Sequence, residues 1–151
     1  MTPSPSEIWV VRPTLEQLNA LKAGTMMEHL GITFVEVGAD FVEATMPVDH
    51  RTRQPFGLLH GGASVVLAET LGSAAANFCV APERHYCVGL EVNANHVRAV
   101  RSGIVTGRAR PLHLGRRTQV WETHIYEEAG RLVCISRLTL AVLERREERP
   151  R

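Results

Sequence analysis

The sequence has little of several features that mark large classes of protein. Lysine occurs once, at Lys22, and aromatic residues make up 5% of the 151 residues. Basic and acidic residues nearly balance, at 17 and 16, which leaves a formal net charge of +1. A chain with so little net charge gives no electrostatic reason to bind nucleic acid or an anionic membrane surface. We therefore expect neither as a partner.

Cysteine and metal-binding patterns are also scarce. The three cysteines, Cys79, Cys87 and Cys134, are odd in number and lack C-x-x-C spacing, which argues against a disulfide framework and a zinc knuckle. No H-E-x-x-H spacing, dinucleotide-binding glycine motif or P-loop occurs. We expect no metal and no cofactor. The first residues do not form a signal peptide, so the predicted location is the cytoplasm.

No hydrophobic run is long enough to predict a membrane span. The most apolar stretch, residues 61–80, has 12 apolar residues of 20, together with Glu69, Asn77 and three glycines. A span needs a more uniformly apolar run, so we expect a buried helix. The overall composition, 44% hydrophobic and 22% charged, is typical of a globular protein. We expect one domain over 1–151, with a core of about 14–143, a leader at 1–12 and a charged tail at 144–151.

The hydrophobic periodicity predicts short helices, one long helix and mostly antiparallel strands. Thr14 and Gln17 have capping-box spacing at the start of a helix over 14–22, and Gly31 ends a further helical turn over 26–30. The long helix covers about 61–80. Turn residues separate the expected strands, which cover 32–37, 41–48, 86–98, 104–114, 118–127 and 131–143.

These elements predict an α+β architecture, in which an antiparallel sheet of about six strands wraps around one long central helix. The helix carries almost no charge and must be buried against the sheet. In residues 86–98, alternation places Val88, Leu90, Val92 and Ala94 on one apolar face, and His96 shares their parity. Open sheet edges favour pairing, so we expect a homodimer with a continuous sheet.

Glu69 is the first candidate for chemistry, because it is the only charge in the long helix. Burying an unpaired carboxylate costs several kcal/mol, so such a helix carries one only for a reason. Glu69 is either a base or nucleophile, or a structural residue that pairs with an arginine or caps a neighbouring strand. Ser73 lies one turn further on the same helix face, where it either binds a ligand or packs as a small residue.

The start of the long helix is the second candidate. The sequence His60-Gly61-Gly62 precedes it, and the first N–H groups of a helix have no internal partner and lie at the positive end of its dipole. Glycine lets a ligand oxygen approach such groups, which can polarise a carbonyl. Gln54 offers an amide in the preceding loop. A plain glycine-rich helix start is the alternative.

Arginines gather near two strand ends. Gly115, Arg116 and Arg117 form part of the turn between two expected strands, and Arg98 and Arg101 follow another strand. Such a cluster is able to bind phosphate groups. An ordinary solvated turn is the alternative on these residues alone.

Three segments in combination resemble the hotdog-fold acyl-CoA thioesterases. They are Gln54 to Ser73, Val88 to His96, and Pro111 to Arg117, and the resemblance extends over about residues 14–143. The chain is most similar to the branch that contains the 1,4-dihydroxy-2-naphthoyl-CoA thioesterase and the enterobactin-pathway proofreading thioesterase. It is also similar to the 4-hydroxybenzoyl-CoA thioesterase that uses a helix glutamate.

The resemblance implies roles for individual residues. Glu69 corresponds to the carboxylate that attacks the thioester or activates water, and Gly61 to the backbone donor that polarises its carbonyl. Gln54 and His60 correspond to residues that position the carbonyl and the thiolate, and Ser73 to a hydroxyl that holds the water or acyl group. Further substrate-binding residues by this resemblance are His96, Phe56, Val65, Gly62 and Arg98, with Gly115, Arg116 and Arg117 at the CoA nucleotide.

The resemblance also implies an assembly and a reaction. The expected assembly is a homodimer with shared active sites, with Glu69 from one subunit and the His60-Gly61 loop from the other, and a homotetramer made of two dimers. The expected reaction is hydrolysis of an acyl-CoA, with an aromatic or medium-sized acyl group, to the free acid and CoA. The alternatives are a hotdog hydratase or dehydratase, whose motif is not found, and a non-catalytic acyl-CoA binding domain.

Overall fold

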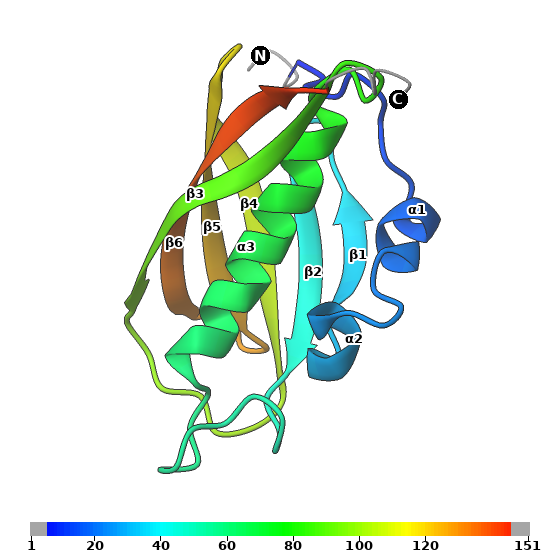
Figure 1. Cartoon of the computed structure of the whole chain (residues 1–151). Helices are drawn as coiled ribbons and strands as arrows, with labels where there is room; N and C mark the ends of the chain where they lie inside the picture. The colour runs from blue at the N-terminus through cyan, green and yellow to red at the C-terminus, as the bar shows by residue number, and fades with distance from the viewer. Residues whose placement is uncertain (1–5, 146–151) are drawn as a thin grey trace, which may run out of the picture.

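The centre of the fold is one helix, α3 (Gly61–Phe78), which lies across one face of a six-stranded antiparallel sheet (Figure 1). The structure is a computed structural model, and it describes residues 6–145. Two short helices, α1 (Leu15–Ala20) and α2 (Met26–Leu30), precede the sheet. The strands are β1 (Thr33–Val37), β2 (Val42–Pro47), β3 (His85–His96), β4 (Ile104–Leu114), β5 (Thr118–Glu127) and β6 (Leu132–Glu144), in the spatial order β1-β2-β4-β5-β6-β3.

Small residues bring α3 close to the sheet. Ala68, Gly72, Ala75 and Ala76 are all buried on its inner side. A Cβ atom on Gly72 would lie 2.7 Å from Cδ2 of Leu138, so a larger residue there would force the Leu138 side chain to shift. Larger side chains fill the space between these contacts, and the predicted architecture of about six strands wrapped around one central helix is therefore confirmed.

Local sequence signals placed most of the elements correctly. Thr14 Oγ1 accepts from the N–H of Gln17, and the Gln17 side chain accepts from the N–H of Thr14, which confirms the capping box. Gly31 adopts the left-handed conformation, with φ 71°, and ends α2. The predicted bounds of β4 and β5 match the structure to the residue, and the hairpin of β1 and β2 is present.

Strand β3 differs from its predicted pattern, because it contains a bulge. Gly89 pairs with Leu140 and Glu91 with Thr139, so that Leu90 is an extra residue between them. Because of this extra residue, the positions that face the core after the bulge have the opposite parity to those before it. Val92 and Ala94 pack on the core as predicted, whereas Val88 and Leu90 are 39% and 62% exposed, so their predicted place on the same face is wrong.

The predicted leader is partly fixed in place, and the long helix ends earlier than predicted. Trp9 is buried, and its indole donates to the carbonyl of Gly38, while Arg12 donates to that of Val37. Helix α3 ends at Phe78, two residues before the predicted end, because the N–H of Cys79 bonds to Ala76 in a tighter turn. The tail residues 146–151 and the first five residues lie outside the described part of the chain.

The two edge strands are held by asparagine side chains. Asn19 donates to the carbonyl of Phe34 on β1 and accepts from the N–H of the same residue, at 2.9 Å each. Asn77 on α3 does the same for Cys87 on β3, at 3.2 and 2.9 Å. Both amides therefore satisfy backbone groups that have no neighbouring strand. Among residues 6–145, no helix is long and apolar enough to cross a membrane.

Replacing Asn77 by alanine would leave two backbone groups of the buried residue Cys87 without partners. We expect Asn77→Ala to lower the free energy of unfolding by about 1–3 kcal/mol, measured by urea denaturation at fixed protein concentration. Asn95→Ala, at an exposed asparagine of the same strand, is the control and should change it by less than about 0.5 kcal/mol. Equal stability of the two variants would contradict this role of the Asn77 side chain.

Candidate active site

Glu69 stands in an otherwise uncharged groove between α2 and α3. The groove has a volume of about 370 Å³, and its apolar lining consists of Leu21, Met26, Met27, Val65 and Val66. Thr25 and Thr70 add two hydroxyl groups. We call this space the Glu69 groove. The structure thus places Val65 beside Glu69, and it adds the α1–α2 segment, which the sequence analysis did not include.

Strand β3 leaves room for the Glu69 carboxylate at one position. A Cβ atom on Gly89 would lie 2.5 Å from Oε1 of Glu69, so any larger residue would push the carboxylate away. Gly89 is therefore a positioning residue that the sequence analysis missed. The available signal was a glycine inside an apolar strand pattern, which indicates a bulge or a close approach.

No arginine neutralises Glu69 in the described chain. None of the side-chain hydrogen bonds or ion pairs among residues 6–145 includes its carboxylate. The alternative of a structural glutamate paired with an arginine therefore finds no partner within this part of one chain. A half-buried carboxylate with free lone pairs is able to accept a proton from water or to attack a carbonyl carbon.

The start of α3 presents a free backbone donor. Nδ1 of His60, the N-cap residue, accepts from the N–H of Gly62 at 2.8 Å. The N–H of Gly61 has no partner among the described residues. Since Nδ1 accepts, a neutral His60 carries its proton on Nε2, where it is able to donate. Gly61 and His60 therefore offer two donors at the positive end of the helix dipole.

Three other predicted residues lie near this end of α3. A Cβ atom on Gly61 would lie 2.7 Å from Nε2 of His96, which places that imidazole directly beside the helix start. The Gln54 side-chain oxygen accepts from the N–H of Phe56, which leaves the Gln54 NH₂ group free to donate. Phe56 itself is 84% exposed at the tip of its loop, so it shapes no pocket within its own chain.

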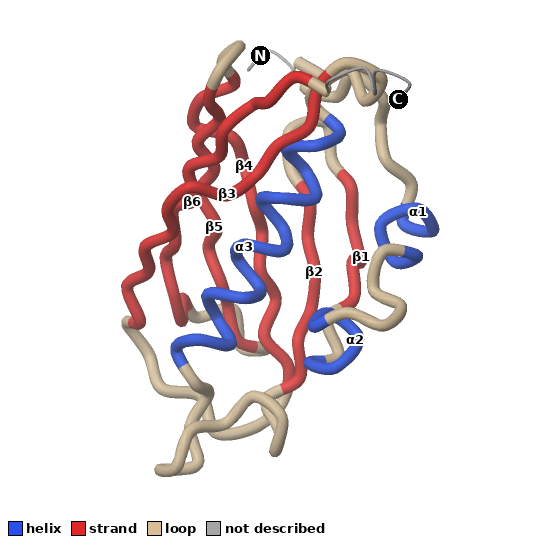
Figure 2. Tube along the Cα trace, viewed as in Figure 1, coloured by secondary structure: helices blue, strands red, loops and turns tan. Residues whose placement is uncertain are grey.

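The two halves of the candidate site do not meet within one chain. Glu69 comes eight residues after Gly61, and the rise of 1.5 Å per residue separates them by about 12 Å along the helix axis. A single carbonyl group cannot reach both. Ser73, which is half-buried, lies a further turn away from Gly61. Figure 2 shows that the loops before α3 and after β3 share the end of the sheet where α3 begins.

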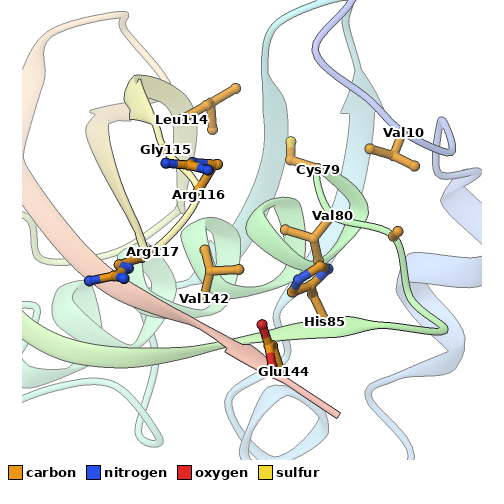
Figure 3. A pocket seen from close by; sticks show the side chains of 11 residues that line it. Val10, Cys79, Val80, His85, Leu114, Gly115, Arg116, Arg117, Val142 and Glu144 are labelled. Atoms are coloured by element: carbon orange, nitrogen blue, oxygen red, sulfur yellow. The ribbon is translucent and has the colours of Figure 1, made fainter.

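Arg116 and Arg117 line a pocket of about 560 Å³ at the opposite end of α3. The pocket also includes Gly115, His85 and Glu144, with Cys79 and Val80 from the end of α3 (Figure 3). We call it the arginine pocket. Gly115 is required in its turn, because a Cβ atom there would lie 2.9 Å from the carbonyl oxygen of Thr118. The lining has two guanidinium groups and one carboxylate, and this excess of positive charge favours an anionic ligand.

The prediction that Arg98 and Arg101 add to this cluster is wrong within one chain. Arg98 follows the far end of β3, where its guanidinium donates to the carbonyl of Leu132. His85, at the other end of β3, lines the arginine pocket. The strand between them extends roughly 35 Å at 3.3 Å per residue. The two groups of arginines therefore lie at opposite ends of the sheet.

The cysteines have the properties of structural residues. Burial raises the pKa of Cys79 to about 12, with a further contribution from Cys87, and burial raises the pKa of Cys87 to about 11. Burial also raises the pKa of Cys134. All three remain thiols at neutral pH and are poor nucleophiles. Within residues 6–145, no three side chains of the types His, Cys, Asp or Glu gather as they would around a metal ion.

Comparison with known proteins gives the family. Residues 56–134 match the model of the thioesterase superfamily. The 1,4-dihydroxy-2-naphthoyl-CoA hydrolase of Escherichia coli is 59% identical over 136 residues, which cover 90% of this chain and 99% of the relative. The proofreading thioesterase EntH of Cronobacter sakazakii is 57% identical over 136 residues, which cover 90% of this chain and 98% of the relative.

A solved structure agrees with this assignment. The crystal structure of a mutant thioesterase from Pseudomonas aeruginosa matches with a TM-score of 0.90 and 54% identity, and the match covers 91% of this chain and 99% of that one. The resemblance noted in the sequence is thereby confirmed. The chain belongs to the thioesterase superfamily and is a hotdog-fold thioesterase.

Proposed function

We propose that the protein hydrolyses CoA thioesters of aromatic or medium-sized acids, with Glu69 as the catalytic carboxylate. The observation that carries this proposal is a lone carboxylate, without a counter-ion in the described chain, on a residue that borders an apolar groove and approaches Gly89 of β3. Two of the similar proteins are named for action on a CoA ester or as a thioesterase, which supports the same class of reaction. Water and the thioester give the free acid and CoA.

The carboxylate and the hydrogen-bond donors of the candidate site fit this reaction. A thioester carbonyl is less stabilised by resonance than that of an ester, so a carboxylate or a carboxylate-activated water suffices to attack it. Glu69 either takes a proton from the attacking water or forms an anhydride that water then hydrolyses. The negative charge on the carbonyl oxygen is stabilised by the free N–H of Gly61, with Gln54 and His60 as further donors. The thiolate then leaves with its electron pair.

The active site is built from two subunits. A two-fold axis that passes near Val65, perpendicular to α3, relates two copies of this helix so that they are antiparallel. Gly61 of each copy then lies beside Glu69 of the other. Val65 lies midway between these residues and is half-buried. The side of α3 that faces away from the sheet is not covered by another described helix or strand (Figure 1). That side is uncharged except for Glu69, so burying it against a second copy carries a small desolvation free energy. Phe56 then reaches the partner's side of the groove.

The same arrangement gives the arginine pocket a role. Cys79, at its edge, follows Glu69 by ten residues, which corresponds to about 15 Å along the helix axis. An extended pantetheine arm spans such a distance. We assign the nucleotide phosphates of CoA to Arg116 and Arg117 of the subunit that supplies Glu69, because guanidinium groups bind phosphate in a bidentate manner.

The Glu69→Gln variant tests the carboxylate directly. It keeps the size of the side chain but can neither accept a proton nor attack, so kcat for an aryl-CoA should fall about 10²- to 10⁴-fold. Release of free CoA with a thiol reagent measures it, and equilibrium binding of CoA should not change. Near wild-type turnover would refute the mechanism, and wild-type protein that binds esters without turnover would favour a binding domain.

A pair of substitutions at Gly61 isolates its N–H group. Gly61→Pro removes this donor at the first helical position, where proline fits well, and His60 already has the extended backbone that precedes proline, with φ −71° and ψ 130°. Gly61→Ala adds the same Cβ atom near His96 but keeps the N–H. We expect kcat to fall about 10²- to 10³-fold more in Gly61→Pro than in Gly61→Ala. Equal losses would exclude this oxyanion donor.

Mixing two inactive variants tests the shared site. In a hybrid of Glu69→Gln and Gly61→Pro subunits, one site contains both defects and the other contains neither. After co-refolding, activity should return to about one quarter of wild type, because half of the dimers are hybrids with one intact site of two. A site contained in one subunit would give no recovery. Each variant refolded alone is the control.

A further inference from the structure

One arginine beside the candidate active site has no part in the reaction described above. Nε of Arg53 donates to the carbonyl oxygen of Arg101 at 2.9 Å, and its Nη2 donates to that of Val48 at 3.4 Å. None of the ion pairs in the described part of the chain includes Arg53, so its guanidinium bonds to backbone carbonyls instead of a carboxylate. We propose that Arg53 is a positioning residue, which holds Gln54 and His60 where they donate to the thioester carbonyl.

The two donors lie on a loop, residues 49–60, that contains no helix and no strand of the sheet. Arg53 and Leu59 pair in an isolated antiparallel bridge, and the N–H of His60 donates to the carbonyl of Thr52 at 2.8 Å. Arg53 therefore lies between the residue that holds His60 and the other donor, which is the next residue in the chain. Fixing its side chain fixes the backbone on both sides of it.

The guanidinium attaches this loop to a second, well-anchored segment, residues 97–103, which connects β3 to β4. The side chain of Val100 in that segment packs in the core, and its carbonyl accepts from the N–H of Leu59 at 2.7 Å. The segment begins directly after His96, whose imidazole lies beside Gly61. Both loops lie at the end of the sheet where α3 begins (Figure 2). The guanidinium therefore links the loop donors to the part of the molecule that supplies the N–H of Gly61.

Orientation, rather than stability, is the expected contribution of Arg53. The residue is exposed, and substitutions at exposed positions usually change the free energy of unfolding little. A hydrogen-bond donor stabilises an oxyanion only within a narrow range of distance and angle, and a misplacement of about 1 Å costs about 10²-fold in rate. Loss of the link at Arg53 therefore lowers kcat, while the fold and the distant arginine pocket persist.

Two substitutions of similar size separate the hydrogen bond from the charge. Arg53→Gln removes the charge but places a donor, its side-chain Nε2, as many bonds from the backbone as Nε of arginine. Arg53→Met has a methyl group at that point and cannot donate. The inference rests on the proposed function, so steady-state hydrolysis of benzoyl-CoA is the measurement. We expect kcat to fall at least about tenfold in Arg53→Met and less than about threefold in Arg53→Gln, with KM and the Kd of CoA unchanged in both.

Arg51→Met is the matched control, because it removes the same charge from the same loop. The described side-chain hydrogen bonds of Arg51 all go to Asp49, two residues earlier, and none reaches the segment 97–103. Its kcat should therefore stay within about threefold of wild type, as expected for an exposed ion pair.

Equal kcat values for Arg53→Met and Arg53→Gln, high or low, would overturn the inference, because the hydrogen bond would then make no difference. An equal loss in Arg51→Met would also overturn it, since any lost contact within the loop would then suffice. If Arg53→Met fails to bind CoA, it is misfolded, and Arg53→Asn, whose amide is one methylene too short to reach Arg101, replaces it in the comparison. Absence of turnover in the wild-type protein would refute the proposed function and this inference with it, whereas turnover with equal variants refutes this inference alone.

Discussion

The close approach of α3 to the sheet determines where the parts of the candidate active site that lie on this helix are held. Alanine and glycine on the inner side of the helix allow this approach, and Gly107 on β4 leaves room for Leu67 and Leu71. Interiors packed at this density resist adjustment by even one methylene group. The helix is therefore fixed along its whole length, and its two ends and its single carboxylate are held at set positions over the sheet.

Several residues that break local rules belong to the candidate site. A carboxylate in an apolar helix, a glycine within a strand and a phenylalanine at an exposed loop tip each lower stability or solubility when considered alone. In the structure, Glu69 and Gly89 are in direct proximity, and Phe56 projects from the loop that precedes α3. Such departures from consistency are common where function, rather than folding, has determined the sequence.

Much of the fold was accessible from sequence because its signals are local. Capping residues, positive-φ glycines such as Gly103 and Gly130, and alternation in β5 and in the first part of β4 each act over a few residues. The bulge in β3 was not predicted, because it depends on how Gly89 faces Glu69, twenty residues earlier in the chain. The groove wall was missed for a similar reason: nothing in Met26 or Met27 alone shows that they lie opposite Val66. Neighbours brought together only by tertiary packing leave no periodic pattern.

The two edges of the sheet are unequal, and this difference limits how copies of the chain can associate. Along β1, the side chains of Arg12 and Asn19 already occupy backbone groups of the strand, and Trp9 occupies the carbonyl of Gly38 directly after it. Along β3, Asn77 occupies only those of Cys87, and the strand continues for nine more residues to His96. A sheet with one usable edge can join one other sheet but cannot be extended further. Pairing along this edge therefore stops at two copies, and the fold is protected against growth into a fibre.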